Sequence, residues 1–518
     1  MTARSRQGPV AAIVGRGAEN TFVVGAVIAV ALVAAVTTIG LLATHKMAAV
    51  ALLLVPGFVA LLWASGNPRL VGLWGLLLTA PLSLSKKFVP VPHMGGAGSY
   101  NIDACDVFLL LLTLFLARDI LARRRRLRLS GVAIAWSGLI LLGFVSVAIG
   151  PMRQVALQQC VEMAKEMWLF LVLLNELVRV RQFLQAFAAV AAGVALEALL
   201  GIAQFIKKGD IGLQKLGEAT LQTLEYANLA TYTGDASTFR IGGLFGHPNL
   251  LAGFFVIVTP IVLAMLMTRQ PPLRRMLLAG TLLLALVALL LTLSRSGWMA
   301  FAIAALVVIG LMLWNPMSRR TAAPVALTLV VGAVLGAGAA APSIIRRLTE
   351  SDSGAIDFRW EWMSVAWRIV LEHPVLGIGL NSFVYNLPGR TQYGDDVDLT
   401  LKFGEVWPVV HDIYLLIWAE QGTLGFACFV AMLLVLLRTG WRNAWRVTDP
   451  QLHAMSIGCL AGVCANIVDG FGSFFLRNPA CARIFWIVAA IMVAIGYWHR
   501  ANAPGGAGTK AGAGGQGR

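Results

Sequence analysis

Long apolar stretches dominate this chain of 518 residues, of which 58% are hydrophobic and only 13% charged. A soluble domain carries roughly a quarter charged residues, so the composition excludes an ordinary soluble fold. A helix needs about 20 predominantly apolar residues to cross a bilayer, and about fourteen stretches approach that length. They lie near residues 21–43, 47–65, 69–83, 105–121, 131–150, 164–178, 183–206, 249–268, 276–293, 297–314, 322–341, 412–437, 451–470 and 484–498. The sequence therefore predicts an all-α polytopic membrane protein with about 12–14 transmembrane helices.

Arginines fall on alternate connections between these stretches. Examples are Arg123 to Arg126, Arg179 with Arg181, Arg274 with Arg275, Arg319 with Arg320, and Arg438 with Arg442 and Arg446. By the positive-inside rule these connections face the cytoplasm. The net charge of +16 is thereby explained by membrane topology, and we expect no nucleic-acid partner.

The same pattern divides the chain into segments and places two long polar loops on the outer face. The segments are N-terminal transmembrane helices 1–206, an outer loop 207–248, central transmembrane helices 249–341, a large outer loop 342–411, C-terminal transmembrane helices 412–498, and a Gly-rich, disordered cytoplasmic tail 499–518. The second loop, of about seventy residues, is too long for an ordinary connection, and loops of that length are functional or disordered. It is not of low complexity, so we expect a folded, helical cap.

The first outer-face motif is FRIGGLFGHPNLLAGF, which places Arg240, a glycine pair, His247 and Asn249 directly before a spanning helix. Glycines allow the backbone to approach a ligand or a neighbouring helix closely. Asn249 also suits a helix cap, an alternative that leaves Arg240 unexplained.

The second motif, LTLSRSGWMAF, puts Arg295 in a tight outward turn between two spans. It is a candidate ligand-binding residue, although an arginine at a membrane edge also extends to lipid headgroups.

The third motif, AIDFRWEWMSVAWRIVLEHPVLGIG, predicts a helix that opens at Asp352 or Ser353 and closes at His373. At 3.6 residues per turn, Arg359 falls on the apolar face with Ala366. A buried guanidinium needs an anion. Either a protein carboxylate or a phosphorylated ligand would serve.

The fourth motif, VWPVVHDIYLLIWAEQGTLG, places His411 and Asp412 where the large loop meets a spanning helix. In one interpretation the pair only starts the helix, with Asp412 at the positive end of the helix dipole. In the other, His411 is a general base, because a neutral imidazole near pH 7 takes a proton from a hydroxyl. Arginines on the same face suit a diphosphate.

Motifs of other enzyme classes are missing from the sequence. It contains no phosphate loop, no zinc-type Cys/His cluster and no nucleophile elbow. We therefore expect a reaction that uses neither a metal ion nor a cofactor.

These four stretches together resemble the O-antigen ligase and polymerase superfamily of bacterial membrane glycosyltransferases. Typical features are the Arg, Gly-Gly and His-Pro-Asn series before a helix, the Ser-Arg-Ser turn, and the Arg/Trp helix that ends in Glu-His-Pro. The series His411, Asp412, nine residues, Gly422, two residues and Gly425 resembles the ligase signature. Family members usually carry Asn, Ser or Gln in place of Asp412. The resemblance covers residues Phe239 to Gly425.

The resemblance implies a GT-C-like architecture in the bacterial inner membrane, with the active site facing the periplasm. It implies transfer of a glycan from undecaprenyl diphosphate to a sugar hydroxyl of lipid A–core or of another glycan, with inversion. His411 would activate the acceptor, and Arg240 and Arg359 would hold the diphosphate. Arg295, His247, Asn249 and Asp412 are the expected substrate-binding residues.

Three functions stay open at this stage. The motif at His411 favours a ligase, and Asp412 keeps a polysaccharide polymerase of the same superfamily in view. A transporter of lipid-linked glycans would instead show internal repeats and charges near the bilayer midplane, for which Glu197 and Glu420 are the candidates.

Overall fold

The computed structural model describes residues 66–82, 84–91, 98–220, 239–332, 355–386 and 409–503, without the side chains of 355–359. The chain divides into two compact units, Met1–Gly72 and Leu73–Arg518. The larger unit contains the elements discussed below, apart from residues 68–72. The predicted spans 21–43 and 47–65 and the tail from residue 504 lie outside the described residues.

Eight helices in the described part of the chain are long and apolar enough to cross a membrane. They are α5 (Gly131–Ile149), α7 (Val180–Lys207), α9 (Pro248–Leu266), α10 (Pro272–Leu291), α11 (Arg295–Trp314), α14 (Ile413–Arg446), α15 (Pro450–Asp469) and α16 (Pro479–Asn502). Each coincides with a predicted span to within a few residues at its start. The prediction of a helical, multi-pass membrane protein is confirmed.

Shorter or more polar helices complete the helical part. They are α3 (Pro68–Thr79), α4 (Ala104–Leu121), α6 (Arg153–Glu176) and α13 (Ala355–Glu372). Helix α6 begins eleven residues before the predicted stretch 164–178, and polar residues along it find partners inside the protein. Gln158 Nε2 donates to Ser99 O at 3.3 Å. Lys165 Nζ lies 2.9 Å from Asp106 Oδ2 and 3.2 Å from Asp103 Oδ2.

A two-stranded antiparallel hairpin is the one described departure from helix. Strand β1 (Ser85–Pro90) pairs with β2 (Ser99–Asp103), with an irregular step between Lys87 and Val89. Sequence analysis did not predict these strands. Asp103, at the end of β2, also lies 2.6 Å from Nη1 of Arg483 in α16, so the hairpin is tied to the helices by buried charges.

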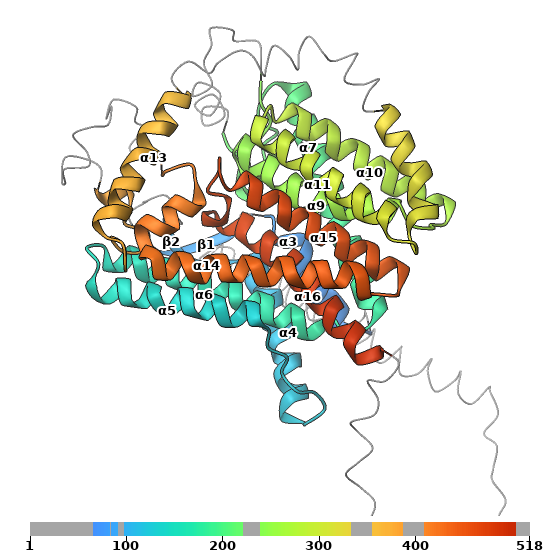
Figure 1. The fold of residues 1–518 in the computed structure, drawn as a ribbon, viewed down its shortest axis with the longest axis horizontal. Helices are drawn as coiled ribbons and strands as arrows, with labels where there is room; N and C mark the ends of the chain where they lie inside the picture. Colours follow the sequence, from blue (N-terminus) through green and yellow to red (C-terminus); the bar gives the residue numbers. More distant parts are fainter. Residues whose placement is uncertain are drawn as a thin grey trace, which may run out of the picture. The chain divides into compact units, whose positions relative to one another are not determined.

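The helices form two groups with α14, α15 and α16 between them (Figure 1). One group contains α7, α9, α10 and α11, and the other contains α4, α5 and α6. Helices α9 and α15 approach each other closely, since a Cβ on Gly462 would lie 2.2 Å from Ile257 O. Small residues permit such backbone contact between membrane helices.

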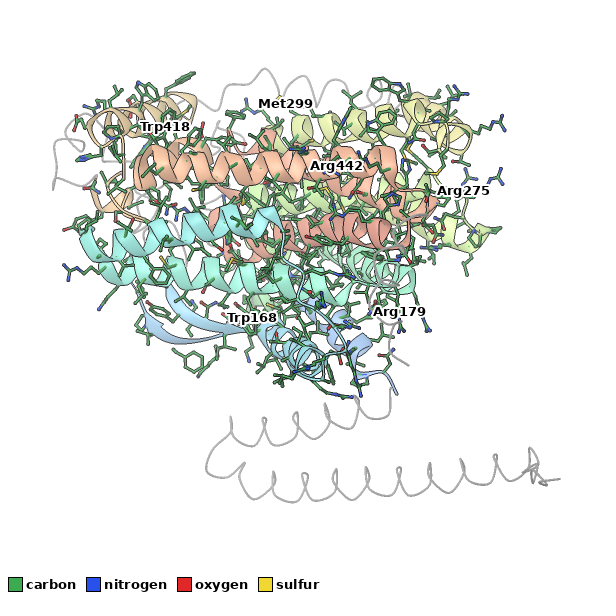
Figure 2. The ribbon with its side chains drawn as sticks, turned by 60° about the horizontal axis from the view of Figure 1, so that its bottom comes forward. Trp168, Arg179, Arg275, Met299, Trp418 and Arg442 are labelled. Atoms are coloured by element: carbon green, nitrogen blue, oxygen red, sulfur yellow. The ribbon has the colours of Figure 1, made fainter. Side chains whose placement is uncertain are left out.

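Arginines from two of the predicted cytoplasmic connections lie at the same end of the helix bundle. Arg179 and Arg275 lie toward one end of the helices, and Trp418 lies toward the opposite end (Figure 2). The first residues of α9, α11, α14 and α16 are at the end opposite the arginine clusters. We call this end the site end.

Candidate functional site

The Gly-Gly loop before α9 is fixed by polar side chains of α7. Gln204 Oε1 accepts a hydrogen bond from Gly243 N at 2.9 Å, and Glu197 Oε2 accepts one from Leu244 N at 3.1 Å. Gly243 has a φ of 55°, and a Cβ there would lie 2.6 Å from Glu197 Oε2. The expected close approach to a neighbouring helix is confirmed at Gly243.

Arg240 lies at the start of this loop and is only 5% exposed. Its Nε donates to Thr292 O at 2.8 Å, and its Nη2 donates to Asn249 Oδ1 at 2.8 Å. Thr292 belongs to the turn between α10 and α11, and Asn249 to the first turn of α9. The guanidinium is therefore oriented from two sides.

His247, not Asn249, caps α9. His247 Nδ1 accepts a hydrogen bond from Asn249 N at 3.2 Å, which places the ring proton of a neutral His247 on Nε2. The cap interpretation of Asn249 is wrong: this residue lies inside the helix and binds Arg240.

The electrostatics of His247 bring a third segment into the site. Burial, together with the positive charges of Arg240 and His411, lowers the pKa of His247 to about 3. The imidazole of His247 is therefore neutral at physiological pH. Arg240 binds Asn249 in the turn that His247 caps, and His411 is near enough to the His247 ring to act on it electrostatically.

His411 and Asp412 precede α14 and have different environments. The half-buried His411 ring packs edge-to-face on Phe474, with centroids 5.1 Å apart. Asp412 Oδ1 accepts hydrogen bonds from Tyr414 N at 2.8 Å and Leu415 N at 2.9 Å. Burial raises the pKa of Asp412, and these two donors oppose that rise. The helix-capping interpretation of Asp412 is confirmed.

Residues 470–478, between α15 and α16, form part of the same region and were missed by sequence analysis. Besides the contact of Phe474 with His411, Gly470 O accepts a hydrogen bond from Ile413 N at 3.0 Å. A Cβ on Gly472 would lie 3.8 Å from Ser296 Cβ in α11. An arginine directly before a helix on the predicted outer face, in FFLRNP, was the available signal.

Arg295 and Arg359 complete the predicted set. Arg295 is the half-buried first residue of α11, three residues after Thr292, and Ser294 caps that helix by accepting from Gly297 N at 3.4 Å. Arg359 lies in α13, seven residues before the buried Ala366, and its side chain is outside the described part. Helix α13 ends at Glu372, directly before His373, as predicted.

Comparison with known families identifies the region around this site. Residues 280–430 match a family model described as O-antigen ligase. This stretch is similar to that family, and we call it the ligase domain. No curated protein matches the chain.

The ligase domain comprises most of α10, all of α11 and α13, and α14 as far as residue 430. It includes Arg295, Arg359, His411 and Asp412, whereas Arg240 and His247 precede it. The match confirms the predicted family resemblance and an enzyme of the membrane glycosyltransferase type.

The first glycine of the ligase signature breaks helix α14. Gly422 has a φ of 63°, and a Cβ there would lie 2.2 Å from Val375 O. Backbone groups freed by the break find partners in the chain that follows α13. Thr423 N donates to Pro374 O at 2.7 Å, and Gly379 N donates to Glu420 O at 2.9 Å. The signature spacing therefore has a structural cause at Gly422, since backbone groups within a bilayer must be satisfied by protein.

Glu420 lies two residues before this break and is 1% exposed. Its carboxylate accepts hydrogen bonds from Asn381 N at 2.9 Å and Phe383 N at 3.2 Å, and it forms an ion pair with Arg477. Glu420 therefore joins the loop after α13 to the segment before α16.

Proposed function

We propose that the protein transfers a glycan from undecaprenyl diphosphate to an acceptor sugar hydroxyl at the periplasmic face of the bacterial inner membrane. One observation carries the proposal. Arg240, held by Asn249, and His247 belong to one motif before α9. His411 comes from a segment distant in the sequence and joins them at the site end, where the charges of Arg240 and His411 lower the pKa of His247. A cationic group and an imidazole in one place suit a diphosphate donor and a hydroxyl acceptor.

In this proposal His411 is the general base that takes the proton of the acceptor hydroxyl. The hydroxyl attacks C1 of the donor sugar in a single displacement, and the bond from C1 to the diphosphate oxygen breaks with inversion. Negative charge grows on the departing diphosphate, so arginines fixed beforehand stabilise the transition state. Arg240 and Arg359 hold this leaving group.

The other residues of the set orient the substrates. His247 is neutral and supplies an Nε2–H donor, Asn249 orients Arg240, and Arg295 extends the cationic region along the first turn of α11. Asp412 acts through the backbone, because it holds the start of α14 directly after His411. Binding both substrates in one place adds the proximity effect.

We propose that the arginines supply the positive charge that a metal ion provides in other diphosphate-handling enzymes. Asp103, Cys105 and Asp106 form a group with suitable spacing for a cation. Lys165 and Arg483 already neutralise the two carboxylates of that group. Transfer is therefore expected to persist in EDTA.

The acceptor that we favour is lipid A–core, which makes the protein a ligase. The alternative is a polymerase that extends a lipid-linked polysaccharide, and the departure from the family at Asp412 is the argument for it. In the structure Asp412 caps a helix, a task that Asn and Ser perform as well, so the departure carries little weight. The third alternative, a transporter, relied on Glu197 and Glu420, and both now have structural partners.

Purified protein, an undecaprenyl-diphosphate glycan and lipid A–core test the proposal in the presence of EDTA. We expect transfer by the wild type, none by His411→Ala or Arg240→Ala, and normal transfer by Arg275→Ala at the opposite end of the bundle. Transfer by His411→Ala would refute the general base, and inhibition by EDTA would refute the metal-free reaction.

A deletion strain separates the ligase from the polymerase. Loss of all long-chain lipopolysaccharide is the outcome expected for a ligase. Loss of a secreted polymer with intact lipopolysaccharide would instead identify a polymerase.

A further inference from the structure

The ion pair between Glu420 and Arg477 is deeply buried at the site end. The two side chains are 1% and 6% exposed. Removing two charges from water is costly, and an ion pair in such surroundings is often no more stabilising than apolar residues of the same size. Stability alone is therefore a poor explanation for this pair, and its contacts point to a role in geometry.

On one side the pair holds the short loop that follows α13. Both oxygens of Glu420 accept backbone hydrogen bonds from this loop, from Asn381 N and from Phe383 N. The Phe383 ring in turn packs on Trp362 of α13, with centroids 6.1 Å apart. Through Phe383, Glu420 thus supports α13 at Trp362, in the helix that also contains Arg359.

On the other side the pair holds residues 470–478. Arg477 ends a short 3-10 turn, η5 (Phe475–Arg477), and Phe474 directly before that turn contacts His411. Phe475 is anchored separately, since a Cβ on Gly253 of α9 would lie 2.4 Å from its ring. Arg477 therefore fixes a segment that touches both His411 and α9.

We propose that Glu420 and Arg477 are positioning residues for glycan transfer. They set the distance between His411, which activates the acceptor, and helix α13, which contributes Arg359 to the diphosphate site. This inference rests on the proposed function. Neither residue reacts. The pair acts by holding two backbone segments, each of which carries or touches a residue of the reaction.

Three variants test the role. Glu420→Gln breaks the ion pair and leaves the Arg477 charge buried, Arg477→Lys keeps the charge and loses the planar guanidinium, and Glu420→Gln with Arg477→Met removes both charges. We expect kcat to fall by about 10- to 100-fold in each, with the KM for the donor within about threefold of wild type, because a misplacement of about 1 Å has that effect on rate.

The double variant separates positioning from stability. Because both charges of the pair are removed together, its melting temperature is expected to recover toward the wild-type value while kcat stays low. Recovery of kcat together with the melting temperature would overturn the proposal and reduce the pair to a structural element.

A matched control is Arg483→Gln, which breaks another buried ion pair, with Asp103 at the end of β2. Its folded fraction is expected to retain wild-type kcat. An equal loss of kcat in this control would also overturn the proposal. His411→Ala is assayed in parallel. If His411→Ala is active, the proposed function fails. If it is inactive while the pair variants keep full kcat, only the positioning role fails.

Discussion

Arg240 donates a hydrogen bond from Nη2 to Asn249 Oδ1 at 2.8 Å, and this contact joins the Gly-Gly loop to the first turn of α9. The two residues are neighbours in one motif, yet their interaction defines the orientation of the guanidinium. With Thr292 O on Nε, the position of Arg240 is set by two different helix ends. This arrangement is suited to holding an anionic ligand in one orientation.

Asn249→Ala is expected to weaken binding of the diphosphate donor. The change removes the acceptor of Arg240 and leaves the cap of α9 intact, because His247 provides that cap. A hydrogen bond to a charged group contributes about 1.5–3 kcal/mol, so the donor KM should rise by about 10-fold or more. Initial rates measured over a range of donor concentrations give this KM. Asn315→Ala, which removes a half-buried amide at the opposite end, should leave the donor KM unchanged.

His247→Asn is expected to reduce the acid sensitivity of folding. The pKa of His247 is about 3 in the folded protein, below the ordinary value of 6.5. The unfolded chain therefore binds one more proton between these values, and the stabilisation present above pH 6.5 is lost as pH falls toward 3. Asn cannot be protonated and is a good cap. Between pH 7 and 5 the melting temperature of the variant should fall less steeply than that of wild type. Parallel curves of melting temperature against pH for the two proteins would contradict the low pKa of His247.

The same low pKa has a consequence for activity. His247 is neutral across the range in which a general base of ordinary pKa titrates, so an acidic limb of the rate profile near pH 6–7 must belong to another group. His247→Asn is expected to keep that limb, whatever its effect on rate, and pH profiles of kcat/KM provide the measurement. If the acidic limb of the kcat/KM profile disappears in His247→Asn, His411 is excluded as the source of that limb.

Asp412→Asn should retain both fold and transfer. Asn accepts the same backbone hydrogen bonds as the Asp412 carboxylate, and both are favoured helix caps. Asp412→Ala should instead lose about 1 kcal/mol of stability, measured as a lower melting temperature. A large loss of kcat in Asp412→Asn at normal stability would show that the carboxylate charge acts on His411.

Gly422→Ala is expected to destabilise the protein. A φ of 63° disfavours any residue with a Cβ, and that Cβ would overlap Val375 O. Backbone strain alone costs about 1–3 kcal/mol, and the overlap adds to it. The control is Gly310→Ala in α11, where a Cβ meets open space and helix propensity favours Ala. Thermal unfolding in detergent compares the two, and equal melting temperatures would contradict the break in α14.

The sequence determined the membrane class and most helix boundaries. A spanning helix must be apolar over about 20 residues and must satisfy its own backbone, and both are local properties that a single stretch reveals. The start of α14 after Asp412 and the end of α13 before His373 also follow from local capping chemistry. Motif spacing further identified the family, which the match over residues 280–430 confirms.

Only the tertiary structure decided which residues meet at the site. The contact of His411 with Phe474, the ion pair of Glu420 with Arg477, and the polar face of α6 each join segments distant in sequence. Such contacts depend on how helices pack, and no local pattern encodes the partner. The same holds for Gly422. Its spacing from His411 is visible in the sequence, but the reason lies in a carbonyl of Val375 that packing brings within reach.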